Sequence, residues 1–258
     1  MRWILILLLC PLLGMGQTGP YNHADSSAMD AANTFKWKKL IIPSVFVGYG
    51  AASLFSEELI ELNTSTRYET REHIKPGATI DNYMQYAPAA AVYGLNAFGI
   101  KGKHDLRDRT IIYGSSQLIL SAFIIPMKKL GLEVRPDGSN RASFPSGHTA
   151  TAFSAAQFMF HEYKDSNPWI AFAGYPVAAA TGTYRIFNDR HWVGDVVAGA
   201  GIGMLSTEMA YWLFPYTSKL FHRQNHCDYH GHYGHHASLL VTPTYQQHGI
   251  GIAMLSEF

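Results

Sequence analysis

Six mostly apolar segments alternate with shorter polar stretches along the chain. They cover residues 40–55, 83–100, 110–127, 149–160, 168–184 and 192–216. Apolar segments of this length are candidates for helices, so an all-α fold is expected. Small residues recur in these segments, as at Gly199, Gly201 and Gly203. Because small side chains let helix backbones approach closely, they predict tight packing of the last helix.

The flanking segments differ in character from this core. Residues 1–16 have a basic start, an apolar middle and a small-residue end, which is the pattern of a secretory signal peptide. Residues 17–35 are polar and predict a flexible arm ahead of a helical domain at 36–216. Within that domain, residues 56–82 carry charges of both signs and Pro76-Gly77, and are interpreted as a connector with room for a short surface helix.

The end of the chain carries two further features. Residues 217–237 contain six histidines, His222, His226, His230, His232, His235 and His236. They are interpreted as a solvated linker, with zinc or copper binding as the alternative. Residues 238–258 predict a hairpin of two short strands, 239–245 and 249–255, that packs as an edge or contacts a partner rather than forming a barrel.

Composition separates a membrane protein from a soluble one only in part. Charged residues make up 15% of the 258 residues, against roughly 25% in soluble domains. This low charge favours a helical protein in or on a membrane, and a soluble protein with a large core is the alternative. The net charge of +1 provides no field that would attract nucleic acid. Without the leader, Cys227 is the one cysteine left, so no internal disulfide is expected.

Three clusters between residues 128 and 195 carry the chemistry. The first is Lys128 followed after six residues by Arg135-Pro136, and the second is Pro145-Ser146-Gly147-His148. The third is Arg185, then His191 and Asp195. Together they supply three cations, two histidines, a hydroxyl, a glycine and a carboxylate, which suits a phosphoryl group that is bound, attacked and released.

Each residue type fits a separate task in phosphoryl transfer. Arginine forks and a lysine bind phosphate oxygens, so Lys128, Arg135 and Arg185 are expected to hold the phosphate. Ser146 would add a hydroxyl, and Gly147 would let backbone N–H groups approach at the start of a helix.

The two histidines are suited to two further tasks, attack on phosphorus and proton transfer to the leaving group. Asp195 follows His191 by four residues, so on a helical turn the carboxylate would face the imidazole and fix its tautomer. His191 is therefore predicted as the nucleophile, and His148 as the general acid for the leaving oxygen.

The three clusters in this order resemble the signature of the type 2 phosphatidic acid phosphatase and vanadium haloperoxidase superfamily, K-x6-R-P, P-S-G-H and S-R-x5-H-x3-D. Tyr184 stands where that signature has serine. The resemblance covers roughly residues 40–216. It implies a six-helix core, a phosphohistidine intermediate on His191, and no cofactor or metal requirement.

The resemblance leaves the substrate and the cellular side open. One branch comprises membrane phosphatases of phosphatidic acid, prenyl pyrophosphates, phosphatidylglycerophosphate or lipid A, and the other comprises soluble periplasmic acid phosphatases. Low charge and six apolar segments favour a lipid phosphate substrate and a membrane, while the leader favours the soluble branch. A vanadate-dependent haloperoxidase and a degenerate scaffold protein are further alternatives.

Localisation is expected in the bacterial cell envelope, either in a membrane with the active site facing the periplasm or in the periplasm itself. The distribution of Lys and Arg weakly favours a periplasmic site if six helices span, whereas a cleaved leader would reverse that orientation. The oligomeric state is not indicated by the sequence.

Overall fold

The computed structural model describes residues 37–74, 77, 79–221, 238–246 and 249–257. The expected signal peptide and flexible arm lie outside these residues, and so do the six histidines between residues 222 and 237. The chain divides into two compact units, Met1–Phe221 and His222–Phe258. The domain boundaries expected from the sequence stay predictions.

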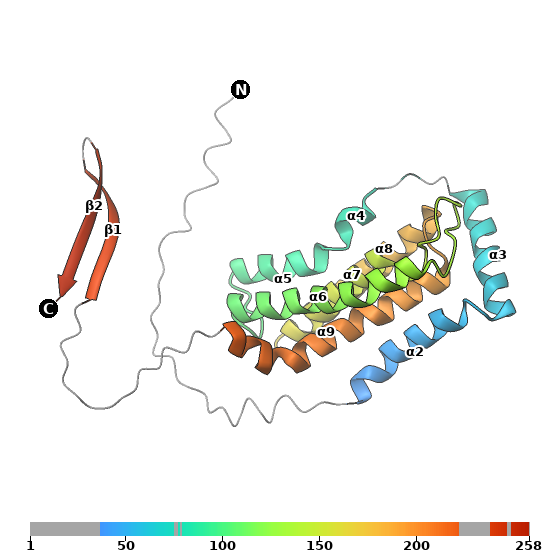
Figure 1. Ribbon diagram of the computed structural model, residues 1–258, viewed down its shortest axis with the longest axis horizontal. Coiled ribbons are helices and arrows are strands. Elements are labelled where there is room, and N and C mark those ends of the chain that lie inside the picture. Colours follow the sequence, from blue (N-terminus) through green and yellow to red (C-terminus); the bar gives the residue numbers. More distant parts are fainter. Residues whose placement is uncertain (1–36, 75–76, 78, 222–237, 247–248, 258) are drawn as a thin grey trace. The chain divides into compact units, whose positions relative to one another are not determined.

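The described part of the first unit is helical (Figure 1). Its elements are α2 (Lys38–Ala52), α3 (Glu57–His73), α4 (Asp81–Met84), α5 (Ala87–Ala97), α6 (Leu106–Leu130), α7 (Gly147–Tyr163), α8 (Pro168–Phe187) and α9 (Val193–Phe221). Each of the six predicted segments coincides with one or more of these helices, so the all-helical fold of this unit is confirmed. Helix α9 continues past Tyr216, where the sequence analysis ends the domain.

The connector predicted at 56–82 needs correction. It contains the 17-residue helix α3, far longer than a short surface helix. Ser56 stands at the N-cap, Glu57 and Glu58 occupy the first turn, and Arg71 and His73 occupy the last. Acidic residues near a helix N-terminus and basic ones near its C-terminus complement the helix dipole. An apolar-segment search misses this helix because its surface is mostly polar.

Local signals explain where the long helices begin and end. Asp105 caps α6, since its Oδ1 accepts a hydrogen bond of 2.8 Å from Asp108 N. Gly131 ends the same helix in the left-handed region, with φ 62°. Asn167 caps α8 by accepting from Ile170 N at 3.2 Å, and Pro168 occupies the first turn, as the sequence predicts.

Helices α7 and α9 form the centre of the unit. Helix α9 packs against α2, α6, α7 and α8, and α7 packs against α5, α6, α8 and α9. Glycines allow the close approach: a Cβ on Gly203 would lie 2.1 Å from the carbonyl oxygen of Ala150, and one on Gly201 would lie 2.5 Å from that of Pro43. The tight packing expected of the last helix is confirmed.

The second unit contains two strands that pair antiparallel, β1 (Ser238–Gln246) and β2 (Gly249–Glu257). The structure describes none of their side chains. Whether this hairpin packs as an edge or contacts a partner therefore stays a prediction.

Candidate active site

His191 and Asp195 meet at the start of α9. Asp195 lies in the first turn, as predicted, while His191 precedes the helix in the turn that leads into it. The two side chains meet although His191 is not helical, with Nδ1 of His191 3.4 Å from Oδ2 of Asp195. Both residues are buried. Nδ1 faces the carboxylate, so Nε2 is the nitrogen available to a substrate.

Burial also sets the charge of the imidazole. Desolvation lowers the pKa of His191 to about 4, and the Asp195 carboxylate opposes that shift only in part. The ring is therefore neutral near pH 7, which is the form in which nitrogen has a lone pair for attack on phosphorus.

The Pro-Ser-Gly-His cluster forms the N-terminus of α7. Ser146 is the N-cap, and its hydroxyl lies 2.9 Å from that of Thr149. Its backbone N donates to the carbonyl of Asp195 at 3.0 Å, which ties the start of α7 to the start of α9. The first N–H groups of a helix lack intrahelical acceptors, so those of Gly147 and His148 are suited to binding an anion.

The first cluster is placed by the end of α6 and the loop that follows. Lys128 lies in the last turn of α6, and its Nζ donates to the carbonyl of Ala142 at 2.9 Å. A Cβ on Gly147 would lie 3.7 Å from Cε of Lys128. The charges of Arg135, Arg185 and Asp195 all act on Lys128, so the three clusters come together at one end of the bundle.

Two buried guanidinium donors in this region lack partners. Nε of Arg135 and Nε of Arg185 are buried and donate to no acceptor among the described residues. Burying a cation with an unused donor is costly unless an anion supplies the acceptor. This arrangement is the strongest structural indication of an anion-binding site.

Helix α4 contributes two residues that the sequence analysis assigns to a connector. Oδ2 of Asp81 accepts a hydrogen bond of 2.7 Å from Nη1 of Arg185, and Asp81 is fully buried. Oδ1 of Asn82 lies 2.9 Å from Nε2 of His148. An anion bound at Arg185 would therefore share this residue with Asp81, and a group approaching Nε2 of His148 would meet Asn82.

Helix α3 supports the turn that carries His191. Arg67 of α3 forms an ion pair with Asp189, and Oδ1 of Asn63 accepts a hydrogen bond of 3.2 Å from Gly194 N. The guanidinium of Arg67 also lies over the ring of Trp192, 5.8 Å from its centroid. These contacts join residues more than 100 positions apart, which no local sequence pattern reveals.

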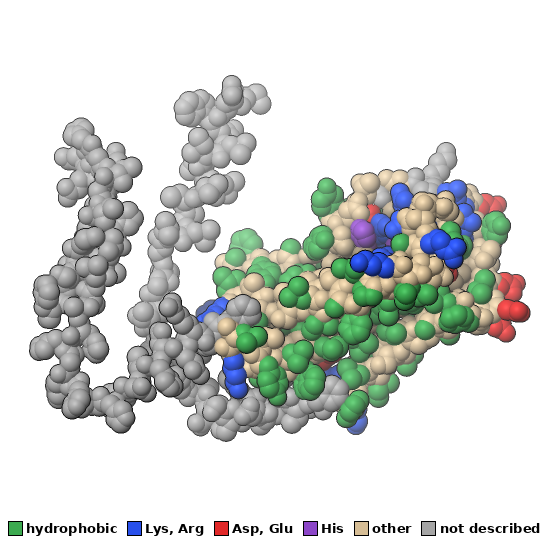
Figure 2. Space-filling model, in the orientation of Figure 1, with side chains coloured by type: hydrophobic (Ala, Val, Ile, Leu, Met, Phe, Trp, Pro, Cys, Tyr) green, Lys and Arg blue, Asp and Glu red, His purple; other side chains and the backbone are tan. Residues whose placement is uncertain are grey.

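Cationic and hydrophobic side chains lie on different parts of the surface of the helical unit. In Figure 2 a histidine lies among Lys and Arg side chains at one end of the described helices, and hydrophobic side chains cover much of the remaining face. The cationic end and the apolar flank are thus separate parts of the surface shown.

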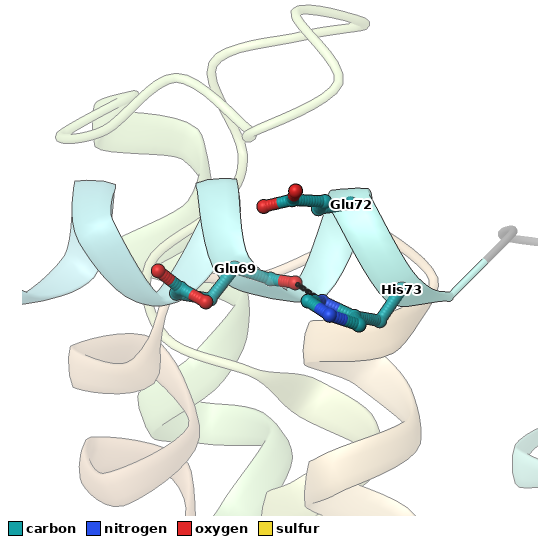
Figure 3. A group of neighbouring side chains, drawn as sticks. All are labelled: Glu69, Glu72 and His73. Atoms are coloured by element: carbon teal, nitrogen blue, oxygen red, sulfur yellow. Dashed lines mark hydrogen bonds between the residues drawn. The ribbon is translucent and has the colours of Figure 1, made fainter.

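A separate group, Glu69, Glu72 and His73, lies at the end of α3 with its ligand atoms within 4.8 Å of one another (Figure 3). All three side chains are exposed, and Nδ1 of His73 lies 3.0 Å from the carbonyl oxygen of Glu69. Exposed acidic groups of this kind are common without an ion, so they give no reason to add a metal to the site.

Comparison with known proteins agrees with this geometry. Residues 104–219 match the model of the PAP2 superfamily. This part of the chain, less than half of its 258 residues, is similar to that superfamily. The match includes α6 to α9 up to Lys219 and every residue of the three clusters.

Individual relatives match over shorter stretches. A lipid A 1-phosphatase of Porphyromonas gingivalis is 39% identical over 135 residues, which is 52% of this chain and 30% of that protein. A lipid A 1-phosphatase of Helicobacter pylori is 30% identical over 101 residues, 39% of this chain and 50% of that protein. The matched region thus spans half or less of each of these relatives.

Among solved structures, a transmembrane PAP2 type phosphatidylglycerolphosphate phosphatase from Bacillus subtilis aligns with a TM-score of 0.46 and 19% identity. The alignment covers 72% of this chain and 98% of that one.

Proposed function

We propose that the protein is a phosphatase that hydrolyses a phosphomonoester or pyrophosphate of a membrane lipid through a phosphohistidine on His191. The observation that carries this proposal is the pair of buried, unpartnered guanidinium donors of Arg135 and Arg185 beside a buried His191–Asp195 pair. Together they provide a place for a phosphate and a nucleophile next to it.

The reaction would proceed in two displacements. Lys128, Arg135, Arg185 and the N-terminus of α7 hold the phosphate oxygens, with Ser146 and Gly147 shaping that N-terminus. Nε2 of His191 forms a bond to phosphorus as the bond to the leaving oxygen breaks, and protonated His148 gives that oxygen its proton. Burial and the charge of Arg185 lower the pKa of His148 to about 4 in the protein alone, and the negative charge of a bound phosphate would raise this pKa and favour the protonated form. Water then attacks phosphorus, the bond to His191 breaks, and His148 receives the proton of the water.

A lipid substrate is supported by apolar surfaces on the helices. Large hydrophobic side chains are exposed along α2, α6 and α8, among them Ile41, Val45, Leu118, Ile125, Trp169 and Phe172. Within the described residues, α6 is long and apolar enough to cross a membrane, and α2 with α3, bent by 88°, would make a second crossing if the pair is counted as one span. Such surfaces suit the acyl region of a bilayer better than water.

The names of two relatives support a narrower proposal for the substrate. Both are named lipid A 1-phosphatases, so we include in the proposal that the phosphate removed is one attached to a lipid A type glycolipid. The expected location is a bacterial envelope membrane with the active site facing the periplasm.

The activity is tested by measuring the phosphate that the full chain, in detergent micelles, releases from each of five substrates. The substrates are lipid A, phosphatidic acid, undecaprenyl pyrophosphate, phosphatidylglycerophosphate and a soluble phosphomonoester. Lipid A is expected to be the best substrate, and preference for the soluble ester would contradict the lipid assignment. His191→Ala is expected to lose at least about a thousandfold in kcat/KM. His73→Ala, an exposed histidine on α3, is the matched control.

The orientation is tested by labelling. A Ser139→Cys variant, with Cys10 and Cys227 replaced by serine, places a thiol in the exposed loop after α6. A maleimide that cannot cross membranes should label it in intact bacterial cells. Labelling only after the cells are lysed would reverse the proposed orientation.

A further inference from the structure

The two oxygens of the Asp195 carboxylate differ in their hydrogen bonds: Oδ2 has donors, and Oδ1 has none among the described residues. Oδ2 accepts from Oγ of Ser143 at 2.5 Å and from the backbone N of Trp192 at 2.9 Å, and it is also the atom nearest to Nδ1 of His191. Oδ1 is buried and has no donor among the described residues. A buried carboxylate oxygen without a donor costs free energy.

Glu133 brings a second such oxygen to the same place. It lies in the loop after α6, and its carbonyl accepts a hydrogen bond of 3.2 Å from the backbone N of Ser143, the residue whose hydroxyl binds Asp195. The two carboxyl groups affect each other, because hydrogen bonding to Asp195 and the charge of Asp195 both raise the pKa of Glu133. Oε2 of Glu133 is buried and, like Oδ1 of Asp195, has no donor within the described part of the chain.

A single proton satisfies both oxygens. Two ionised carboxylates in contact repel each other, and neither can donate, whereas one carboxylic acid beside one carboxylate forms a strong charge-assisted hydrogen bond. Asp195 already has two donors and the imidazole of His191 to stabilise its charge. Glu133 has no such support, so the proton belongs on Glu133.

We propose that Glu133 is a positioning residue that carries a proton near neutral pH and donates it in a hydrogen bond to Oδ1 of Asp195. This bond fixes the rotation of the Asp195 carboxylate, which keeps Oδ2 toward His191. The proposal rests on the proposed function, because the orientation of His191 matters only if His191 reacts.

The electrostatics of the pair agree with this arrangement. Burial, followed by the contact with Asp195, raises the pKa of Glu133 to about 9. The charged and titratable groups near the pair come from each element around it: Lys128 on α6, Arg135 in the same loop, Arg185 on α8, and His191 before α9. Lys128 and Arg135 interact electrostatically with Asp195, which favours the charge on Asp195.

The protonation state is tested without any assay of activity. The infrared difference spectrum of wild type minus Glu133→Gln, recorded at pH 7, should contain the carbonyl band of a protonated carboxylic acid. The band should disappear as the pH rises through about 9. Absence of the band at pH 7 would overturn the proposal, whatever the protein hydrolyses.

The positioning role is tested with two substitutions at Glu133. Glutamine keeps a donor for Oδ1 of Asp195, so Glu133→Gln should retain kcat/KM within about threefold at pH 7, whereas Glu133→Ala should lose about tenfold or more. The measured reaction is phosphate release from phosphatidic acid in detergent micelles, with thermal unfolding of both variants as the control for folding. Wild type should lose activity above about pH 9 more steeply than Glu133→Gln does.

Two kinetic outcomes would contradict this role. Equal activity of Glu133→Ala and wild type would show that the bond does not position His191. Equal loss in Glu133→Gln and Glu133→Ala, with both variants folded, would show that Glu133 acts as a carboxylate and not as a donor. A wild-type protein that releases no phosphate would reject the proposed function, and the infrared result would still decide the protonation of Glu133.

Discussion

Arg67 and Asp189 are joined by two hydrogen bonds, of 3.0 Å between Nε and Oδ1 and 3.3 Å between Nη2 and Oδ2. The Asp189 side chain is buried while a third of the Arg67 side chain is exposed. The pair joins α3 to the turn that carries His191, so α3 helps to hold the residue proposed as the nucleophile.

Loss of this pair should weaken both stability and turnover. Asp189 has a positive φ of 59°, which asparagine tolerates, so Asp189→Asn removes the charge without straining the backbone. We expect a decrease of about 1–2 kcal/mol in the free energy of unfolding, since one partner is partly exposed, together with a lower kcat. Denaturant unfolding and phosphate release measure the two effects. Unchanged values of both would show that the Arg67–Asp189 pair does not support the turn.

The buried imidazole of His191 should make stability fall on acidification. The pKa is about 4 in the folded state against an ordinary 6.5, so between these values the unfolded chain binds more protons than the folded one. Stability is therefore highest above pH 6.5 and decreases as the pH falls toward 4, by a total of about 3 kcal/mol from this residue. Thermal unfolding of wild type and His191→Gln from pH 7 to pH 5 should show the steeper loss in wild type. Parallel curves would assign the loss to other groups.

Close packing of α7 on α9 should not tolerate a methyl group at Gly203. The added Cβ would lie 2.1 Å from the carbonyl oxygen of Ala150, so Gly203→Ala should destabilise the protein by about 1–3 kcal/mol. Gly114→Ala is the matched control on α6, where an added Cβ meets nothing within 4 Å, and alanine there should stabilise the helix slightly. A stable Gly203→Ala variant would mean that the two helices separate readily.

Asp81 should weaken the binding of phosphate. Its carboxylate neutralises Arg185, which the proposed mechanism needs for phosphate oxygens. Asp81→Asn keeps the shape of the side chain and removes the charge, so inorganic phosphate should inhibit the variant at a concentration about tenfold lower than wild type. Asp165→Asn, an exposed position between α7 and α8, is the control. Weaker inhibition of Asp81→Asn would show instead that Asp81 serves mainly to orient Arg185.

The sequence predicts those parts of the molecule that are encoded locally. Apolar segments indicate the helices, Pro168 indicates a helix start, and the glycines of α9 indicate close packing. The three clusters identify Lys128, Arg135, His148, Arg185, His191 and Asp195 because their order and spacing are unusual, and the structure brings all of them to one end of the bundle.

The remaining features depend on contacts between distant residues. Asp81 meets Arg185 across 104 positions, and nothing in the neighbourhood of Asp81 distinguishes it from a surface aspartate. Glu133 lies inside the first cluster, but the role proposed for it depends on Ser143 and Asp195, which the fold brings to it. Helix α3 could have been found from Glu57, Glu58 and Arg71, because charges of opposite sign at the two ends of a polar segment are typical of an exposed helix.

The length of α6 bears on how deep the chemistry would take place in a bilayer. Its 25 residues extend about 37 Å, against about 30 Å for the hydrocarbon layer of a bilayer. If α6 crosses the membrane, its final turn emerges among the polar head groups, and Lys128 lies in that turn. The length of α6 then determines the depth of Lys128 in the bilayer. It would set the phosphate-binding cations at the level where a lipid phosphate already resides, so that the substrate need not leave its leaflet to react.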